Sequence, residues 1–178
     1  VYHNQNKPTL VIGTTELFPI VRDYDVAQGR FITAQDVQRG NSVAVVGSDL
    51  ATNLFGTTNP IGQQLRIKNI TFRVVGLLKP KGAFLGNNQD DVIFVPISTM
   101  ADRIIGRTSP FGTEVTFISV SAQDESKMAA AKTQITNLLR LRHKIVAEDD
   151  FTVRSQDEAL NIIGAVTGAL TIMLVAIA

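Results

Sequence analysis

The residues that could hold a metal ion or act as a nucleophile are few in this sequence. It contains no cysteine, which excludes thiolate zinc sites, iron–sulfur clusters, disulfides and a cysteine nucleophile. His3 and His143 are the only histidines, and no H-x-x-x-H spacing places two imidazoles on one helix face. His143 follows basic residues near the end of an expected helix, where a cation interacts favourably with the helix dipole. We therefore expect no metal site.

Two pairs of adjacent carboxylates are the other candidates for acid–base chemistry. They are Asp90-Asp91 and Asp149-Asp150. Neighbouring side chains on a strand point to opposite faces, so adjacency alone does not bring two carboxylates together. We interpret the first pair as the end of a loop and the second as residues that follow a helix.

The glycines and serines do not complete a known catalytic motif. The segment Gly82–Gly86 lacks the lysine of a phosphate-binding loop, and no Gly-Lys dipeptide occurs in the chain. No G-x-S-x-G sequence marks a nucleophilic serine. The glycines are therefore interpreted as turn residues, and we expect no catalytic residue and no cofactor in this chain.

Composition narrows the class of protein further. The chain has 178 residues, which suits one domain or two small lobes, and its formal net charge is +1. This charge balance, with 6% aromatic residues and no tryptophan, argues against a nucleic-acid-binding protein. Val1 is not a methionine, and we interpret the sequence as a fragment of a longer chain.

The first hundred residues are typical of short strands joined by turns. Thr33 and Asp36 form a capping-box pattern, and Ser48 is expected to cap a helix that Gly56 ends. Gly82–Asp91 is expected to be a loop. Apolar and alternating patterns predict strands at Thr9–Ile12, Ser42–Val46, Leu65–Ile67, Phe72–Val74 and Val92–Val95, the third and fourth forming a hairpin.

The following region has a different pattern. A strand is expected at Val115–Val120 and another at Phe151–Val153, with a long helix between them that Ser121 or Asp124 could cap. Together they predict a β-α-β unit. The helix has an apolar stripe formed by Met128, Ala131, Ile135, Leu138 and Leu139.

The end of the sequence is free of charge. All 33 charged residues lie between Lys7 and Glu158, and none lies in Ala159–Ala178. A helix needs about 20 apolar residues to cross a bilayer, so this stretch predicts the start of a transmembrane helix. The alternative is a buried helix of a soluble protein. The apolar residues expected in the membrane are Leu160, Ile162, Ile163, Val166, Leu170, Ile172, Met173, Leu174, Val175 and Ile177.

Several segments, taken in order, resemble one protein family, the extracytoplasmic domain of MacB-type, or FtsX-like, ABC transporter permeases. The resemblance extends from about Gly13 to the end of the sequence. It is carried by Val11–Thr15, Gly29–Phe31 with Asp36, Val43–Gly47, Leu54–Gly56, Asn59–Gln63, Phe72–Leu77, Asp90–Pro96, Leu138–His143 and Asp149–Phe151.

The resemblance implies an α+β fold with two lobes, a porter-like β-α-β lobe and an inserted β-rich lobe. The expected boundaries are residues 1–28 for an incomplete start of the porter-like lobe, 29–112 for the β-rich lobe, 113–156 for the β-α-β part and 159–178 for the membrane helix. The resemblance also implies a second permease protomer, in a homodimer or pseudodimer, and an ABC ATPase subunit or domain in the cytoplasm. In the exporter branch it further implies a periplasmic adaptor and an outer-membrane tunnel.

The leading hypothesis is therefore a non-enzymatic domain on the periplasmic side of the bacterial inner membrane. It would couple cytoplasmic ATP hydrolysis to export or extraction outside the membrane, through contacts with an adaptor or substrate. Two alternatives stay open at this point. One is a division-signalling permease domain of the FtsX-like type. The other is a soluble ligand-binding domain or hydrolase with a buried apolar C-terminal helix.

Overall fold

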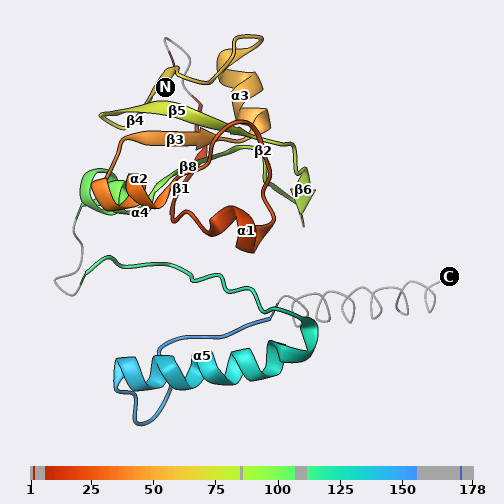
Figure 1. Cartoon of the computed structure of the whole chain (residues 1–178), viewed down its shortest axis with the longest axis vertical. Coiled ribbons are helices and arrows are strands. Elements are labelled where there is room, and N and C mark those ends of the chain that lie inside the picture. Colours follow the sequence, from red (N-terminus) through yellow and green to blue (C-terminus); the bar gives the residue numbers. More distant parts are fainter. Residues whose placement is uncertain (1, 3–6, 85, 107–111, 156–172, 174–178) are drawn as a thin grey trace. The chain divides into compact units, whose positions relative to one another are not determined.

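The computed structural model describes residues 2, 7–84, 86–106, 112–155 and 173. The chain divides into two compact units, Val1–Val120 and Ser121–Ala178, and each is described here by itself. The first unit holds a six-stranded mixed sheet with short helices, and the described part of the second holds one long helix (Figure 1). The α+β class expected from the sequence is confirmed.

The large sheet has the strand order β1-β8-β3-β5-β2. Strand β2 pairs with the C-terminal end of β5, and β4 pairs with the N-terminal end of β5. Strand β1 is parallel to β8 and β3 is parallel to β5, whereas the remaining pairs are antiparallel. The predicted hairpin is present as β4 and β5. The strands are β1 Leu10–Thr14, β2 Val26–Gly29, β3 Val43–Val46, β4 Gln64–Ile67, β5 Ile70–Leu78 and β8 Val92–Pro96.

Short helices cover both faces of this sheet, with α3 and α1 on opposite sides in Figure 1. They are α1 Phe18–Arg22, α2 Ala34–Arg39, α3 Ser48–Phe55 and α4 Ile97–Thr99, which continues into the π-helical turn η1 Met100–Ile105. The predicted capping box is confirmed, because Thr33 accepts a hydrogen bond from the Asp36 backbone and the Asp36 carboxylate accepts one from the Thr33 backbone.

The N-terminus of α3 differs from the sequence-based expectation. Gly47, not Ser48, occupies the N-cap position, and no side chain caps the helix. A Cβ atom at Gly47 would lie 2.2 Å from the Asp90 carbonyl oxygen, so this close approach of two backbones requires glycine. The predicted end of the helix at Gly56 is confirmed, with a positive φ of 59°.

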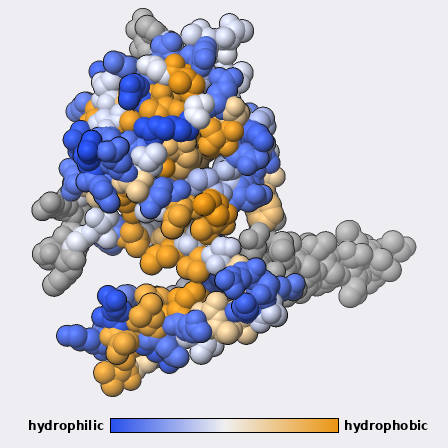
Figure 2. Space-filling model, in the orientation of Figure 1, coloured by the Kyte–Doolittle hydropathy of each residue, from blue (hydrophilic) through white to orange (hydrophobic). Residues whose placement is uncertain are grey.

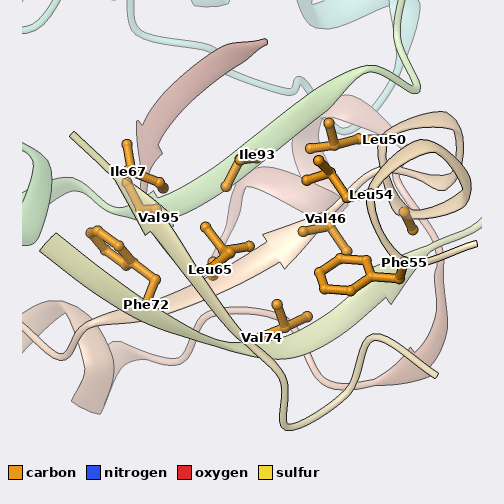
Figure 3. Close-up of a cluster of buried hydrophobic side chains, with 12 residues drawn as sticks. Val46, Leu50, Leu54, Phe55, Leu65, Ile67, Phe72, Val74, Ile93 and Val95 are labelled. Carbon is orange, nitrogen blue, oxygen red and sulfur yellow. The ribbon is translucent and has the colours of Figure 1, made fainter. Parts of the chain in front are cut away.

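Two apolar clusters form the core, one on each face of the sheet. The first lies under α3, where Val46 and Val74 meet Leu50 and Leu54 (Figure 3). The second is centred on Phe94, a fully buried side chain whose ring contacts Phe18, Tyr24 and Phe31 at centroid distances of 4.9 to 5.9 Å. Burial of each such side chain contributes roughly 1.5–3 kcal/mol, so these clusters stabilise the first unit.

The strand expected at Val115–Val120 is not formed, and neither is the one at Phe151–Val153. Both predictions are therefore wrong for this structure. A strand needs a hydrogen-bonded neighbour, and no described strand pairs with either segment. The predicted β-α-β unit is thus represented by its helix alone, α5 Met128–His143, which follows the 3₁₀ turn η2 Glu125–Lys127.

The start of the second unit also corrects a prediction. Asp124 stands at the N-cap position of η2, and Lys127 stands at that of α5, but neither makes a side-chain capping hydrogen bond. Ser121 lies before both N-cap positions, and its hydroxyl donates to the neighbouring carbonyl of Ala122.

The predicted lobe boundary at residue 28 lies inside a hydrogen-bonded sheet. Strands β1 and β2 come before it or cross it, and they pair with β8 and β5. The division between the two compact units falls after Val120, and the lobe boundaries expected from the sequence stay a prediction.

Within the described part of the chain, no helix is long and apolar enough to cross a membrane. Nine of the ten residues expected in the transmembrane helix lie outside the described residues, and the tenth, Met173, is exposed.

Candidate functional site

Asp90 and Asp91 hold different parts of the chain, so they do not form an acid–base pair. Asp90 is buried and accepts hydrogen bonds from the backbone N–H groups of Lys81 (2.8 Å) and Gly82 (2.7 Å). Asp91 forms an ion pair with Lys7 at 3.0 Å and accepts a hydrogen bond from the hydroxyl of Thr9 at 2.9 Å. The first carboxylate closes the segment before β8, and the second fixes the residues that lead into β1.

Asp149 and Asp150 lie at the C-terminal end of α5, where each meets a basic side chain. Arg140 donates two hydrogen bonds to Asp149, at 2.7 and 2.9 Å. This bonding lowers the pKa of Asp149 and raises that of Arg140. His143 Nδ1 lies 2.8 Å from Asp150 Oδ1. The contacts tie the segment after the helix to its last turn.

Asp36 is the centre of the most connected polar cluster in the first unit. Its carboxylate is 3% exposed and accepts hydrogen bonds from Arg30 (2.6 Å), Asn41 (2.9 Å) and both the backbone and hydroxyl of Thr33. Burial alone would raise the pKa of Asp36, but these donors outweigh it and hold that pKa well below its usual range. The cluster joins the loop before α2 to the start of β3, which is a structural role.

The side chains that bind metals do not gather in this structure. Across residues 2, 7–84, 86–106, 112–155 and 173, no three or more histidine, aspartate or glutamate side chains are placed to hold an ion together.

The first unit has an apolar hollow on its surface. Its walls come from β1, α1, the α4–η1 segment and residues 112–119. Leu10, Leu17 and Ile105 line it and are each more than half exposed. Figure 2 shows hydrophobic side chains gathered at the lower end of this unit. Exposed apolar surface of this kind marks contact sites for other molecules.

Further apolar side chains lie outside the folded core. Phe117 and Ile118, in the segment that was expected to be a strand, are 60% and 70% exposed. The stripe of α5 is only partly covered. Leu138 is 53% exposed, whereas the other four residues of the stripe are partly buried, namely Met128, Ala131, Ile135 and Leu139. These residues have the pattern of a buried face but are not fully buried by the described residues.

Comparison with known proteins identifies the domain type. Residues 1–138 match the family model of the MacB-like periplasmic core domain. The chain belongs to this family. The resemblance drawn from the ordered sequence segments is thereby confirmed, including its assignment to the periplasmic domain.

The core domain is similar to part of several curated proteins named macrolide export ATP-binding/permease protein MacB. The one from Azoarcus sp. (strain BH72) is 33% identical over 172 residues, which are 96% of this chain and 25% of that protein. The one from Marinobacter nauticus is 34% identical over 178 residues, or 99% of this chain and 26% of that protein. The chain thus spans about a quarter of the length of these relatives.

Solved structures have the same fold as the core domain. The periplasmic region of MacB from Actinobacillus actinomycetemcomitans superposes with a TM-score of 0.76 at 25% identity, covering 92% of this chain and 70% of that one. The extracellular domain of a noncanonic ABC-type transporter, YknZ, from Gram-positive bacteria superposes with a TM-score of 0.65 at 21% identity. It covers 82% of this chain and 71% of that chain, and the likeness concerns the fold alone.

One feature of the core domain was missed by sequence reasoning. The glycine-rich segment predicted as a loop contains a small hairpin, β6 Ala83–Phe84 and β7 Asn87–Asn88. The apolar residues Phe84 and Leu85 between Gly82 and Gly86 were the available signal, because turn glycines around a short apolar run are typical of a hairpin.

Proposed function

We propose that this MacB-like core domain is the extracytoplasmic part of an ABC transporter permease. In this role it couples ATP hydrolysis on the cytoplasmic side to export or extraction outside the membrane, by transmitting motion and contacting other proteins or the substrate. The ATPase activity belongs to a nucleotide-binding domain outside these 178 residues.

The match of residues 1–138 to the family model is the observation that carries this proposal. The names of the similar proteins, which combine an ATP-binding part and a permease part, support it. The apolar hollow of the first unit and the exposed Leu138 on the apolar stripe of α5 support a role in contacts.

The proposal assigns partners and a location to the chain. The partners are a second permease protomer, an ABC ATPase and, in an exporter, a periplasmic adaptor with an outer-membrane tunnel. The stretch from Ala159 to Ala178 would start a membrane helix in the inner membrane, with the core domain on the periplasmic side.

The hollow offers a direct test in the full-length transporter, assayed in cells for macrolide export and in membranes for ATP hydrolysis. Introducing Leu17→Asp with Ile105→Asp places two charges on an apolar contact surface. We expect export to fall by about fivefold or more, equivalent to about 1 kcal/mol of lost interaction, while basal ATP hydrolysis persists.

A matched control carries Gln64→Asp with Thr71→Asp, two exposed polar positions on the β4–β5 hairpin. This control should export normally. Equal export by the hollow variant and the control would contradict a coupling role for the hollow. Loss of ATP hydrolysis and export together would indicate general damage to the transporter.

A further inference from the structure

The linker between β5 and the β6–β7 hairpin runs close to the end of α1. Lys79 and Lys81 both lie in this linker, and their side chains bond to residues at or just after the end of α1. In Figure 1, β6 lies on the side of the first unit where α1 ends. Phe18 and Val21 of α1 line the apolar hollow, so the linker lies between the hollow and the hairpin.

The side chain of Lys81 holds the end of α1. Its Nζ donates to the carbonyl oxygen of Arg22 at 2.7 Å and to that of Asp23, and it lies 4.5 Å from the centre of the Tyr24 ring. Asp23 ends the helix in the left-handed conformation, with a φ of 53°. The last carbonyls of a helix have no partner within it, and a cation there also interacts favourably with the helix dipole. The Lys81 side chain is only 26% exposed, so its ammonium group is largely enclosed by these contacts.

The main chain of Lys81 holds the base of the hairpin. Its N–H donates to Asp90 Oδ1 at 2.8 Å, and the Gly82 N–H donates to Asp90 Oδ2 at 2.7 Å. Asp90 is buried, and its own N–H donates to Asn88 Oδ1 at 2.8 Å. The Gln89 N–H donates to the Gly82 carbonyl at 3.1 Å, which closes the two arms of the hairpin. Hydrogen bonds to a buried carboxylate are strong, so the base is fixed at the point where Lys81 joins it.

Lys81 therefore bonds to two elements through two different groups. The ammonium group bonds to α1, and the backbone N–H bonds to the carboxylate that holds the hairpin. Neither element is embedded in the core, since α1 has no buried residue and β6 and β7 pair only with each other among the described strands. Elements with few buried contacts move at low energetic cost, so a contact that they share affects both.

We infer that Lys81 is a positioning residue that couples the hollow to the β6–β7 hairpin, so that a displacement of α1 changes the orientation of the hairpin. The inference rests on the proposed function, in which this domain transmits motion. It names the contact through which that motion crosses the first unit. Coupling between two sites is a free energy carried by packed side chains and hydrogen bonds, and it can be measured by combining mutations at both.

Lys79 provides a matched comparison two residues away. Its ammonium group forms an ion pair with Asp25 at 3.0 Å, but both side chains are more than half exposed. Exposed ion pairs contribute little, because water and salt screen them. The Lys79 N–H donates to the Asp25 carbonyl at 2.9 Å, next to the pairing of β2 with β5. Removal of the Lys79 side chain should therefore leave the coupling in place.

The experiment measures the coupling in the full-length transporter in lipid nanodiscs. Phe84, on β6 and 47% exposed, is replaced by 4-fluorophenylalanine, which reports on the hairpin by fluorine NMR. Leu17→Asp disturbs the wall of the hollow at the start of α1. We expect Leu17→Asp to shift the fluorine signal, and Lys81→Met to reduce that change by at least about threefold. In the Lys79→Met background the change should be as large as in the wild type.

Hydrogen exchange tests how Lys81→Met acts. The amide of Tyr24 donates to the Pro19 carbonyl at the end of α1 and should exchange about fivefold faster once the ammonium group is lost. The amides of positions 81 and 82 should stay protected, because their bonds to Asp90 are made by the main chain. Lys81→Arg should retain the coupling, since a guanidinium group also donates to carbonyls and stacks on an aromatic ring.

An equal change of the fluorine signal in the wild-type and Lys81→Met backgrounds would overturn the inference, and so would the absence of any change in the wild type. A loss of coupling in Lys79→Met or in Lys81→Arg would also overturn it. Loss of protection at positions 81 and 82 in Lys81→Met would do the same, because the side chain would then support the hairpin directly.

Macrolide export in cells is measured separately, so that the two proposals can fail independently. If the coupling is absent while Leu17→Asp with Ile105→Asp still reduces export, the inference fails and the proposed function stands. If the coupling is present but Lys81→Met exports as well as the wild type, the inference stands and the proposed transmission of motion through this domain fails.

Discussion

The two units of this chain bury their apolar residues to different extents. In the first unit, apolar residues of β3, β5 and β8 are enclosed on both faces by helices and loops, and Phe72 and Phe94 are fully buried. In the second unit, the apolar stripe of α5 includes no buried residue. Both patterns are clear in the sequence, so the difference comes from what faces them and not from the patterns themselves.

This contrast indicates which contacts stabilise each unit. The first unit has its own core and can hold surface features, such as the β6–β7 hairpin, in fixed positions. An amphipathic helix gains most of its stability from packing its apolar face against a neighbour. We therefore expect α5 to depend on contacts beyond those of the described residues, and the first unit to be stable through its own.

The largest expected effect comes from removing a ring at the centre of the sheet. Phe94→Ala should destabilise the first unit by about 3–5 kcal/mol, since it leaves a cavity among Phe18, Tyr24 and Phe31. Leu141→Ala, on α5 and 76% exposed, should change stability by less than about 0.5 kcal/mol. Hydrogen exchange of the β3 and β8 amides under denaturant measures the first unit alone. Comparable losses of stability in the two variants would contradict the difference in burial between the two units.

A second comparison sets a buried carboxylate against an exposed one. Asp36→Asn should cost the first unit roughly 1–3 kcal/mol, because it disturbs the bonds from Arg30, Asn41 and Thr33 within a buried cluster. Asp149→Asn removes an exposed partner of Arg140 and should produce little measurable change. Chemical denaturation followed by circular dichroism measures the stability of both variants. A larger loss of stability in Asp149→Asn than in Asp36→Asn would contradict this prediction.

The same carboxylate predicts how the first unit responds to acid. The folded-state pKa of Asp36 lies well below the unfolded value of about 3.9, so the unfolded chain binds more protons between the two values and stability falls as pH falls. The contribution of Asp36 is fully present above about pH 5 and is lost progressively below about pH 4. The stability difference between the wild type and Asp36→Asn should therefore shrink in acid. A difference that stays constant from neutral pH to pH 2 would be inconsistent with this assignment.

The smallest contrast concerns two threonines on helices. Thr33→Ala removes the N-cap of α2 and should cost about 1 kcal/mol. Thr133→Ala lies inside α5, where the Thr133 hydroxyl donates to the Ala129 carbonyl, and alanine should stabilise that helix by a few tenths of a kcal/mol. Thermal melts of both variants, with helix content measured at 222 nm, should show opposite signs. A shift in the same direction for both would indicate that capping does not decide the stability of α2.

Much of the first unit was predictable because its signals are local. The run at Val43–Val46, the alternation around Lys68-Asn69 and the Thr33–Asp36 capping box each describe interactions between residues close in sequence. The resemblance of the ordered segments to the MacB-type domain was also visible, and the family match confirms it.

Other features depended on neighbours that a local pattern does not reveal. The glycine at position 47 is required by the carbonyl of Asp90, far along the chain, so the helix cap was misplaced by one residue. The segment at Val115–Val120 has the composition of a strand, but a strand forms only when a partner supplies hydrogen bonds. The hairpin at Phe84 owes its direction to the buried carboxylate of Asp90.

The sequence by itself determined the absence of cysteine chemistry and the separation of a charged body from an uncharged end, because composition and charge pattern encode these directly. The family and the α+β class followed from the resemblance of ordered segments to a known domain. Only the tertiary structure decided which apolar residues are covered, which of two adjacent carboxylates is buried, and that β1 and β2 belong to the same sheet as β5 and β8. The physical reason is that burial and strand pairing are properties of contacts between distant segments, and those contacts exist only once the chain has folded.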